Sequence, residues 1–233
     1  MKGFMTIVLG AMLTISACAF GSKTDSVTNE RNVSDFTGVD VGNGIKTNVT
    51  IGDSCGATVT APSDVIDNIV TEVKNGTLFI YWKKKQDIKR LDRIEVNVTA
   101  VSINRIKTSS GARVTTDSIN ADVLTLAASS GSQLEVTAHA NSVVAKASSG
   151  SVIEIAGNSQ KSDFDASSGA RIKAEKLLAD NGTARASSGA GVTINTSTRL
   201  DAEASSGGRI RYTGTPSNTM VSASSGGSVS RLK

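Results

Sequence analysis

The sequence predicts an all-β protein, a right-handed parallel β-helix with coils of about 19 residues that close at Ser-Ser-Gly turns. Three observations predict this fold. The tripeptide SSG recurs seven times, aliphatic residues keep a fixed offset from it, and aromatic residues make up only 3% of the chain. A core with so few aromatic side chains has to be built from Ala, Val, Ile and Leu, which suits thin layers of stacked strands.

The spacing of the repeat indicates a stacked structure. Helical repeats usually need more than about 30 residues, and the leucine and asparagine frame of leucine-rich repeats is missing here. A parallel β-helix fits, because each coil is then one unit that stacks about 4.8 Å from the next. The motifs begin 18 to 20 residues apart, at Ser109, Ser129, Ser148, Ser167, Ser187, Ser205 and Ser224.

The residues after each motif alternate as in a strand with one buried face. The third residue after each motif glycine is always aliphatic: Val114, Leu134, Ile153, Ile172, Val192, Ile210 and Val229. The fifth is also expected to face inward: Thr116, Val136, Ile155, Ala174, Ile194, Tyr212 and Arg231. The inward row fails only at Arg231, so the stack is expected to end in that coil.

The motif glycines are the predicted structural turn residues. One corner of each coil is expected to need a positive φ or a close inner approach, which glycine provides without steric cost. The two serines are expected to bond to the turn backbone and to each other in ladders. The predicted turn glycines are Gly111, Gly131, Gly150, Gly169, Gly189, Gly207 and Gly226.

The position two residues before the first serine of each SSG motif is predicted to form an outward column of alternating charge. It contains Lys146, Asp165, Arg185 and Glu203 if the coils stack in register. Neighbouring opposite charges on adjacent strands contribute about 0.2–1 kcal/mol per pair. We interpret this column as a device that opposes slippage of the coils rather than as a binding site.

The first 32 residues are predicted to lie outside the fold. Residues 1–17 have the pattern of a lipoprotein signal peptide: an apolar stretch too short for a comfortable membrane span is followed by ISAC, with small residues before Cys18. Cys18 is the predicted lipidation site, and an ordinary secretory signal is the alternative. Residues 18–32 are interpreted as the lipidated cysteine and a flexible tether.

Residues 33–233 are predicted to form a single β-helix domain. Residues 33–108 lack the motif but keep the alternation, so they are expected to be an irregular N-terminal part of the stack. Asn75-Gly76 lies between two strand-like runs and predicts a tight hairpin turn. Residues 109–233 are expected to form the seven SSG coils.

Candidate catalytic residues are scarce. His139 is the only histidine, and it is interpreted as a stacked or surface residue near the position of Ile119 in the preceding coil. A nucleophile elbow GxSxG is absent, and Cys and His are too few for a zinc site. Cys55 is interpreted as a small half-buried residue rather than a reactive thiol. We therefore expect a non-enzyme with no catalytic residue, no metal and no cofactor.

One basic segment, residues 83–93, is a candidate contact with anionic glycans or lipid headgroups. The alternative is a solvated loop that prevents edge pairing and aggregation. The net charge of +4 is too weak to argue for nucleic acid as a partner. The basic residues of the segment are Lys83, Lys84, Lys85, Lys89, Arg90 and Arg93.

The layout of the chain resembles a known family. The stretches FTGVDVGNGIKTNVTIG, NGTLFIYW and RIEVNVTAVSINRIKTSSGARV, followed by the serine-glycine coils, are similar in order to the auto-transporter adhesin head GIN domain family, over about residues 33–215. The resemblance implies secreted or lipid-anchored bacterial envelope proteins with a β-helical fold. It brings no defined catalytic residues.

The predicted function is that of a non-catalytic cell-envelope lipoprotein, an adhesin-like binding module that contacts glycans or cell surfaces. A periplasm-facing structural or envelope-stress scaffold is the alternative, and a polysaccharide-cleaving β-helix enzyme is a third, less favoured hypothesis. The expected location is the outer membrane, at the cell surface or on its periplasmic face. The expected partners are the membrane, through the N-terminal lipid, and a glycan or an envelope protein, with the oligomeric state left open.

Overall fold

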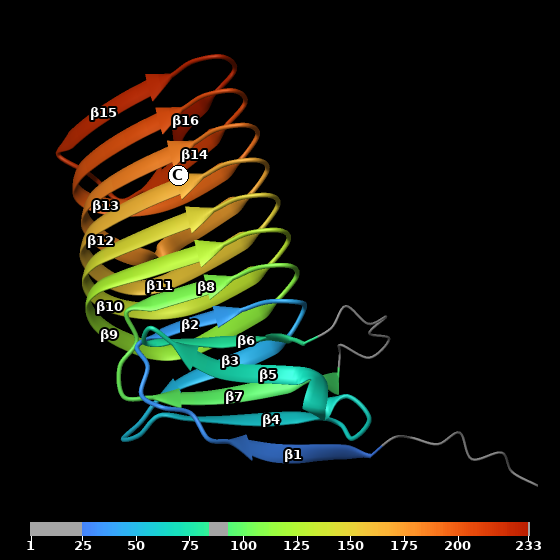
Figure 1. Ribbon diagram of the computed structural model, residues 1–233. Helices are drawn as coiled ribbons and strands as arrows, with labels where there is room; N and C mark the ends of the chain where they lie inside the picture. The colour runs from blue at the N-terminus through green and yellow to red at the C-terminus, as the bar shows by residue number, and fades with distance from the viewer. Residues whose placement is uncertain (1–24, 84–92, 233) are drawn as a thin grey trace, which may run out of the picture.

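The computed structural model describes residues 25–83 and 93–232. They form a stack of flat coils, with a less regular N-terminal end at the bottom of Figure 1 and the last coil at the top. Neighbouring coils are joined by parallel strand pairing along the stack. The predicted β-helix with a spacing of about 19 residues is confirmed.

Long strands form the body of the stack. Each begins just after one SSG motif, curves round the far side of the coil and ends at the alanine before the next motif (Figure 1). The register stays in phase: Leu134 pairs with Ile153, and Ala147 pairs with Ala166. The long strands are β9 (Arg113–Ala128), β10 (Gln133–Ala147), β11 (Val152–Ala166), β12 (Arg171–Ala186) and β13 (Gly191–Ala204). β14 (Arg209–Thr213) and β15 (Asn218–Ala223) both pair with β13, and β16 (Ser228–Arg231) stacks on β14 as the start of the last coil.

The core is a set of inward columns between the two layers of each coil. The predicted inward aliphatic residues from Val114 to Ile210 are at most 2% exposed, and Val229 in the last coil is half-buried. Phe164, the largest fully buried side chain, lies between Ala145 and Ala184 of the neighbouring coils. Small residues beside a large one keep the layers parallel at interior packing density. Arg231 is exposed, so the inward row ends in the last coil as predicted.

Each SSG motif forms a tight type I′ corner, in which both central residues have positive φ. φ is 48–53° at the second serines and 71–76° at the motif glycines. The N–H of the residue after each glycine donates to the carbonyl oxygen of the first serine at 2.8–3.3 Å. The predicted positive φ is therefore confirmed, and it falls on two residues of each corner rather than one.

Of the two reasons expected for glycine at the corner, the close inner approach does not apply. A Cβ added at Gly111, Gly131, Gly150, Gly169, Gly189 or Gly207 would have no heavy atom within 4 Å. Backbone conformation alone therefore accounts for glycine at these positions. The crowded position is the next one, which is small in every coil: Ala112, Ser132, Ser151, Ala170, Ala190, Gly208 and Gly227.

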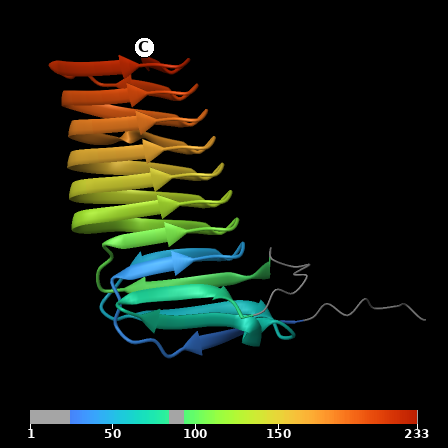
Figure 2. The ribbon, with the colours of Figure 1, turned by 45° about the horizontal axis from the view of Figure 1, so that its top comes forward.

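Main-chain bonds, rather than the motif hydroxyls, connect successive corners. The N–H of Gly111 donates to the carbonyl oxygen of Ser130, and the same bond repeats up to Gly207 at 3.0–3.1 Å. Figure 2 shows the corners aligned along one edge of the stack. The predicted ladder of motif serine hydroxyls is replaced by hydroxyls one residue after the glycine. Ser132 Oγ donates to the carbonyl oxygen of Thr108 at 3.1 Å, and Ser151 Oγ donates to that of Ala128 at 2.8 Å.

The N-terminal end combines parallel and antiparallel pairing. In one layer, β9 is followed by the parallel strands β3 and β7 and then by the antiparallel strands β4 and β1. In the other layer, β8 is followed by the parallel strands β2 and β6 and then by the antiparallel strand β5. The predicted hairpin turn at Asn75-Gly76 is confirmed between β5 and β6. The elements are β1 (Ser26–Arg31), β2 (Gly38–Val41), β3 (Lys46–Ile51), β4 (Gly56–Pro62), the 3-10 helix η1 (Ile66–Asn68), β5 (Ile69–Lys74), β6 (Thr77–Trp82), β7 (Glu95–Ala100) and β8 (Arg105–Thr108).

The predicted tether is wrong for residues 26–31. These residues form β1, which pairs antiparallel with β4 at the end of the stack. Val27 and Arg31 are half-buried, and Arg31 donates to the carbonyl oxygen of Ile66 at 2.9 Å. The fold therefore starts before residue 33. The predicted signal peptide of residues 1–17 lies outside the described residues.

An eighth corner lies at Asn43-Gly44, which the sequence reasoning missed. Their φ angles of 58° and 71° match the SSG corners, and the N–H of Gly44 donates to the carbonyl oxygen of Ser110 at 2.9 Å. The corner joins β2 to β3 and stacks under the first SSG motif. Asparagine adopts positive φ readily, so GNG replaces SSG without changing the turn.

The charged column has the predicted register but different ion pairing. Lys146 pairs with Asp165, and Arg185 with Glu203, as strand neighbours. The ion pair that forms joins Arg185 to Asp163 at 3.1 Å, across adjacent columns of the same face. Both side chains are about half exposed, so the pair contributes at most about 1 kcal/mol.

The corner conformation predicts how substitutions at one motif affect stability. We expect Gly169→Ala to lower the free energy of unfolding by about 1 kcal/mol, because alanine disfavours positive φ although it would meet no neighbour. Ser168→Gly should change it by less than about 1 kcal/mol, because glycine relieves strain but adds freedom to the unfolded chain. Urea unfolding of each variant measures both effects. A neutral Gly169→Ala would contradict the assigned role of φ.

Candidate functional site

The stack has two outward faces covered by polar side chains. We call the outward residues after the corners the first face, and those before the corners the second face. The strand register aligns the first face into two long columns. One column contains Lys46, Arg113, Gln133, Val152, Arg171, Gly191, Arg209 and Ser228. The other contains Asn48, Thr115, Glu135, Glu154, Lys173, Thr193, Arg211 and Ser230.

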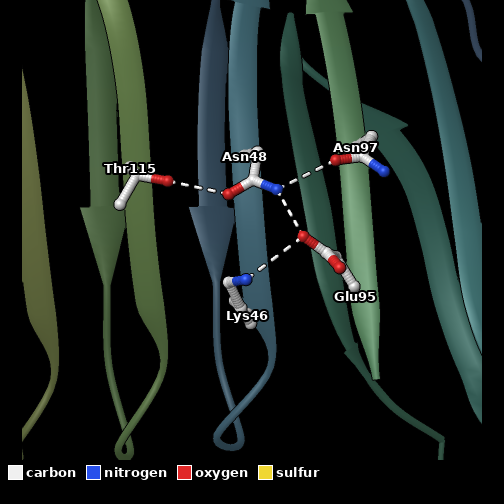
Figure 3. A network of polar contacts seen from close by, with 5 residues as sticks. All are labelled: Lys46, Asn48, Glu95, Asn97 and Thr115. Carbon is white, nitrogen blue, oxygen red and sulfur yellow. Dashed lines mark hydrogen bonds and ion pairs between the residues drawn. The ribbon is translucent and has the colours of Figure 1, made fainter. Parts of the chain in front are cut away.

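A polar network crosses three strands near the N-terminal end of the first face (Figure 3). The Asn48 amide donates to Glu95 Oε1 at 2.6 Å and to Asn97 Oδ1 at 3.0 Å, and its Oδ1 accepts from Thr115 at 2.8 Å. Lys46 Nζ donates to the same Glu95 oxygen at 3.2 Å. The network ties β7 and β3 to β9, so it joins the irregular end to the first SSG coil.

This network also sets the ionisation of its carboxylate. The hydrogen bond from Asn48, and then that from Lys46, hold the pKa of Glu95 below its ordinary value. Both donors favour the charged form of the carboxylate. The contacts drawn in Figure 3 join the five residues to one another. We therefore assign a structural role to this end of the first face.

The first face has a different character over β12, β13 and β14. Arg171, Gly191 and Arg209 are consecutive in one column, and Lys173, Thr193 and Arg211 are consecutive in the other. Because Gly191 has no side chain, a hollow of about 510 Å³ lies between the flanking cations. Glu175 and Leu232 also line it. We call this feature the basic hollow.

The predicted basic segment lies mostly outside the described residues, which exclude Lys84, Lys85, Lys89 and Arg90 as well as the predicted lipidation site Cys18. Lys83 and Arg93, the first and last residues of the segment, are described, and both are exposed. Trp82, which adjoins Lys83, is only 7% exposed and belongs to the core rather than to a contact surface. The role predicted for the segment stays a prediction.

The candidate reactive residues have ordinary surroundings in the structure. His139 Nδ1 lies 3.1 Å from Asn158 Oδ1, and the residue pairs in register with Asn120 rather than with Ile119. Cys55 is half-buried, and its thiol is 3.8 Å from the carbonyl oxygen of Phe36. Within residues 25–83 and 93–232, no group of three His, Cys, Asp or Glu residues is arranged to hold a metal ion. No helix in those ranges is long and apolar enough to span a membrane.

Fold and surface together define a class of protein, the parallel β-helices whose strand register aligns outward polar residues into columns. The chain belongs to the family described as "Putative auto-transporter adhesin, head GIN domain", whose model matches residues 35–216. This membership confirms the resemblance found in the sequence. A comparison with curated protein sequences finds no match.

Three solved structures share the fold. A putative adhesin from Bacteroides fragilis is similar with a TM-score of 0.84 and 18% identity, covering 91% of this chain and 98% of that one. A putative adhesin from Parabacteroides distasonis has a TM-score of 0.74 and 18% identity, covering 90% and 98%. A putative lipid binding protein from the same species has a TM-score of 0.68 and 17% identity, covering 91% and 98%. At these identities the likeness concerns the fold alone.

The Asn48 network predicts a specific pH response. The lowered pKa of Glu95 stabilises the fold at pH values above the ordinary glutamate range, and this contribution is lost as the pH falls through the lowered pKa. We expect Asn48→Ala to raise the pKa of Glu95 and to reduce this acid-dependent loss. Carboxyl-carbon NMR titration reports the pKa directly.

Asn97→Ala is the matched control, because it removes an amide from the network but leaves both donors to Glu95 in place. It should leave the pKa of Glu95 close to that of the unmodified protein. Equal titration of Glu95 in all three proteins would show that Asn48 does not control its charge.

Proposed function

We propose that this protein is a non-catalytic, adhesin-like lipoprotein of the bacterial cell envelope, whose polar faces contact glycans or cell surfaces. The observation that carries the proposal is the set of outward columns, which the strand register holds rigidly along the stack. A rigid surface loses little conformational entropy on binding, so contacts spread over several coils can add up to useful affinity.

Family membership supports a binding role over a catalytic one. The chemistry of the described residues is consistent with this. The one histidine contacts an asparagine amide, and no carboxylate or serine hydroxyl forms a hydrogen bond with it among those residues. A histidine that activates a serine nucleophile in a catalytic triad has such partners within hydrogen-bond distance.

We propose that lipid on Cys18 anchors the chain to the outer membrane with the β-helix exposed. β1 begins at Ser26, so only a short segment separates that cysteine from the folded end. The coils then extend away from the membrane, and the SSG corners lie along one side of the stack.

A periplasm-facing scaffold is the second candidate, and the C-terminal end of the stack favours it. Met220 and Val221 of β15 are 46% and 51% exposed, because the last coil has no neighbour above it in the described chain. Such an apolar end could pack against an envelope protein. The two candidates differ in which side of the outer membrane the coils occupy.

Protease treatment of intact cells that produce this protein tests the proposal. We expect the β-helix to be lost from intact cells, because an adhesin must face outward. Survival until the outer membrane is permeabilised would contradict the adhesin-like function and favour the scaffold. Detection with an antibody against the coils distinguishes the two outcomes.

The variant Cys18→Ala is the control for anchoring. Because the variant lacks the thiol that would carry the lipid, it should incorporate no labelled fatty acid, whereas the unmodified protein should incorporate it. Equal labelling of the two proteins, or no labelling of the unmodified protein, would contradict the lipoprotein part of the proposal.

A further inference from the structure

The basic hollow differs from the rest of the first face in its charge balance. Lys173 forms an ion pair with Glu154 at 2.8 Å. Among the described residues, Arg171, Arg209 and Arg211 have no carboxylate within ion-pair distance. Gly191 and Thr193 separate these cations from one another along the two columns, so none of the three arginines has an opposite charge beside it on the neighbouring strand β13. Their charges therefore add no cross-strand ion pair that would fix the register.

The spacing of the cations creates a place for an anion. Arg171 and Arg209 lie on strands two coils apart, which places their backbones about 10 Å from each other. Gly191 lies between them, and a Cβ at this position would be no closer than 3.9 Å to a neighbour. An anionic group above Gly191 can therefore be approached by a guanidinium from each side. Planar guanidinium groups bind phosphate, sulfate and carboxylate through paired hydrogen bonds.

The second column supplies further contacts for the same group. Thr193 lies between Lys173 and Arg211, and its half-buried hydroxyl can donate to an oxyanion. Among the described residues that line the hollow, Glu175 is the one carboxylate. The site therefore keeps a local excess of positive charge, whereas the middle of the same column contains Glu135 and Glu154.

The composition of the hollow favours an acidic ligand over a neutral one. Its lining contains no aromatic side chain, so a sugar ring has no stacking platform and binding depends on charge. The cations lie at two levels, Arg171 with Lys173 and Arg209 with Arg211, so acidic groups about 10 Å apart along an extended polysaccharide can each meet one level.

The position of the hollow favours a ligand away from the membrane. Eight strand spacings separate β1 from β13, which places the hollow about 40 Å from the N-terminal end. With lipid on Cys18, the membrane that anchors the chain lies at that opposite end.

We infer that the basic hollow is a binding site for an anionic glycan, with Arg171, Arg209 and Arg211 as its anion-binding residues. The inference rests on the proposed adhesin-like function and adds the chemical class of the ligand. The phosphate, sulfate or carboxylate of an acidic polysaccharide lies over Gly191, and its neighbouring groups extend along the stack.

Binding of the purified full-length protein to dextran sulfate, polygalacturonate and uncharged dextran tests this inference. We expect both anionic polymers to bind, more weakly at high salt, and uncharged dextran not to bind. The double variant Arg171→Ser/Arg209→Ser should reduce affinity for the anionic polymers about tenfold, through the loss of two exposed charge contacts.

Two further variants separate a site from general positive charge. Gly191→Val fills the hollow without changing charge, and the open surroundings and strand position favour a folded product. It should weaken binding as well. Arg185→Ser/Arg199→Ser removes the same charge from the second face and should leave binding unchanged. Equal loss in this control, or full binding by Gly191→Val, would overturn the inference.

Vesicles with and without phosphatidylglycerol distinguish the source of the anion. Binding to the anionic vesicles but to neither anionic polymer would overturn the assignment to a glycan. If coils exposed on cells bind a neutral glycan and the arginine variants have no effect, the inference fails while the adhesin-like function survives. Coils protected inside the outer membrane would instead contradict the proposed function itself.

Discussion

The main-chain hydrogen bond between successive corners is the interaction on which the rest of the structure depends. Each motif glycine from Gly111 to Gly207 donates its N–H to the carbonyl oxygen of the second serine in the next motif. The bond joins corners in which both central residues have positive φ. The same conformation in every coil fixes the phase of the strands that leave the corner. Inward aliphatic residues therefore meet inward aliphatic residues from β9 to β14.

The faces follow from this constraint. Since the corner fixes which residues point outward, each outward position becomes a column, and its chemistry can change from coil to coil without cost to the fold. The Asn48 network uses this freedom to join the irregular end to the first coil. In the basic hollow, a glycine takes the place of a side chain between two arginines, and the surface there is concave and positively charged. Structure and binding thus occupy different stretches of one face.

Local patterns made most of the stack predictable from sequence. The period of the SSG motif and the strand alternation identified the coils, the inward residues and the last turn at Arg231. Residues 26–31 were missed because β1 depends on pairing with β4, and its alternating polar pattern has no turn motif beside it. The corner at Asn43-Gly44 shares only one residue with SSG, although the spacing of Val39, Val41 and Ile45 around it offered a signal. The hollow was missed because its cations lie in two coils that are separated by β13, and the gap that Gly191 leaves between them is a feature of the folded surface rather than of the repeat pattern.

Amide hydrogen exchange at the motif glycines tests the central claim most directly. Glycine amides in exposed turns ordinarily exchange fast, whereas here the amides from Gly111 to Gly207 donate to the next corner. The account predicts strong protection at these positions and weaker protection at Gly226, the motif glycine of the last corner. Exchange of all seven amides at the rate of an unstructured peptide would contradict it, because the corners would then not hold the coils in register.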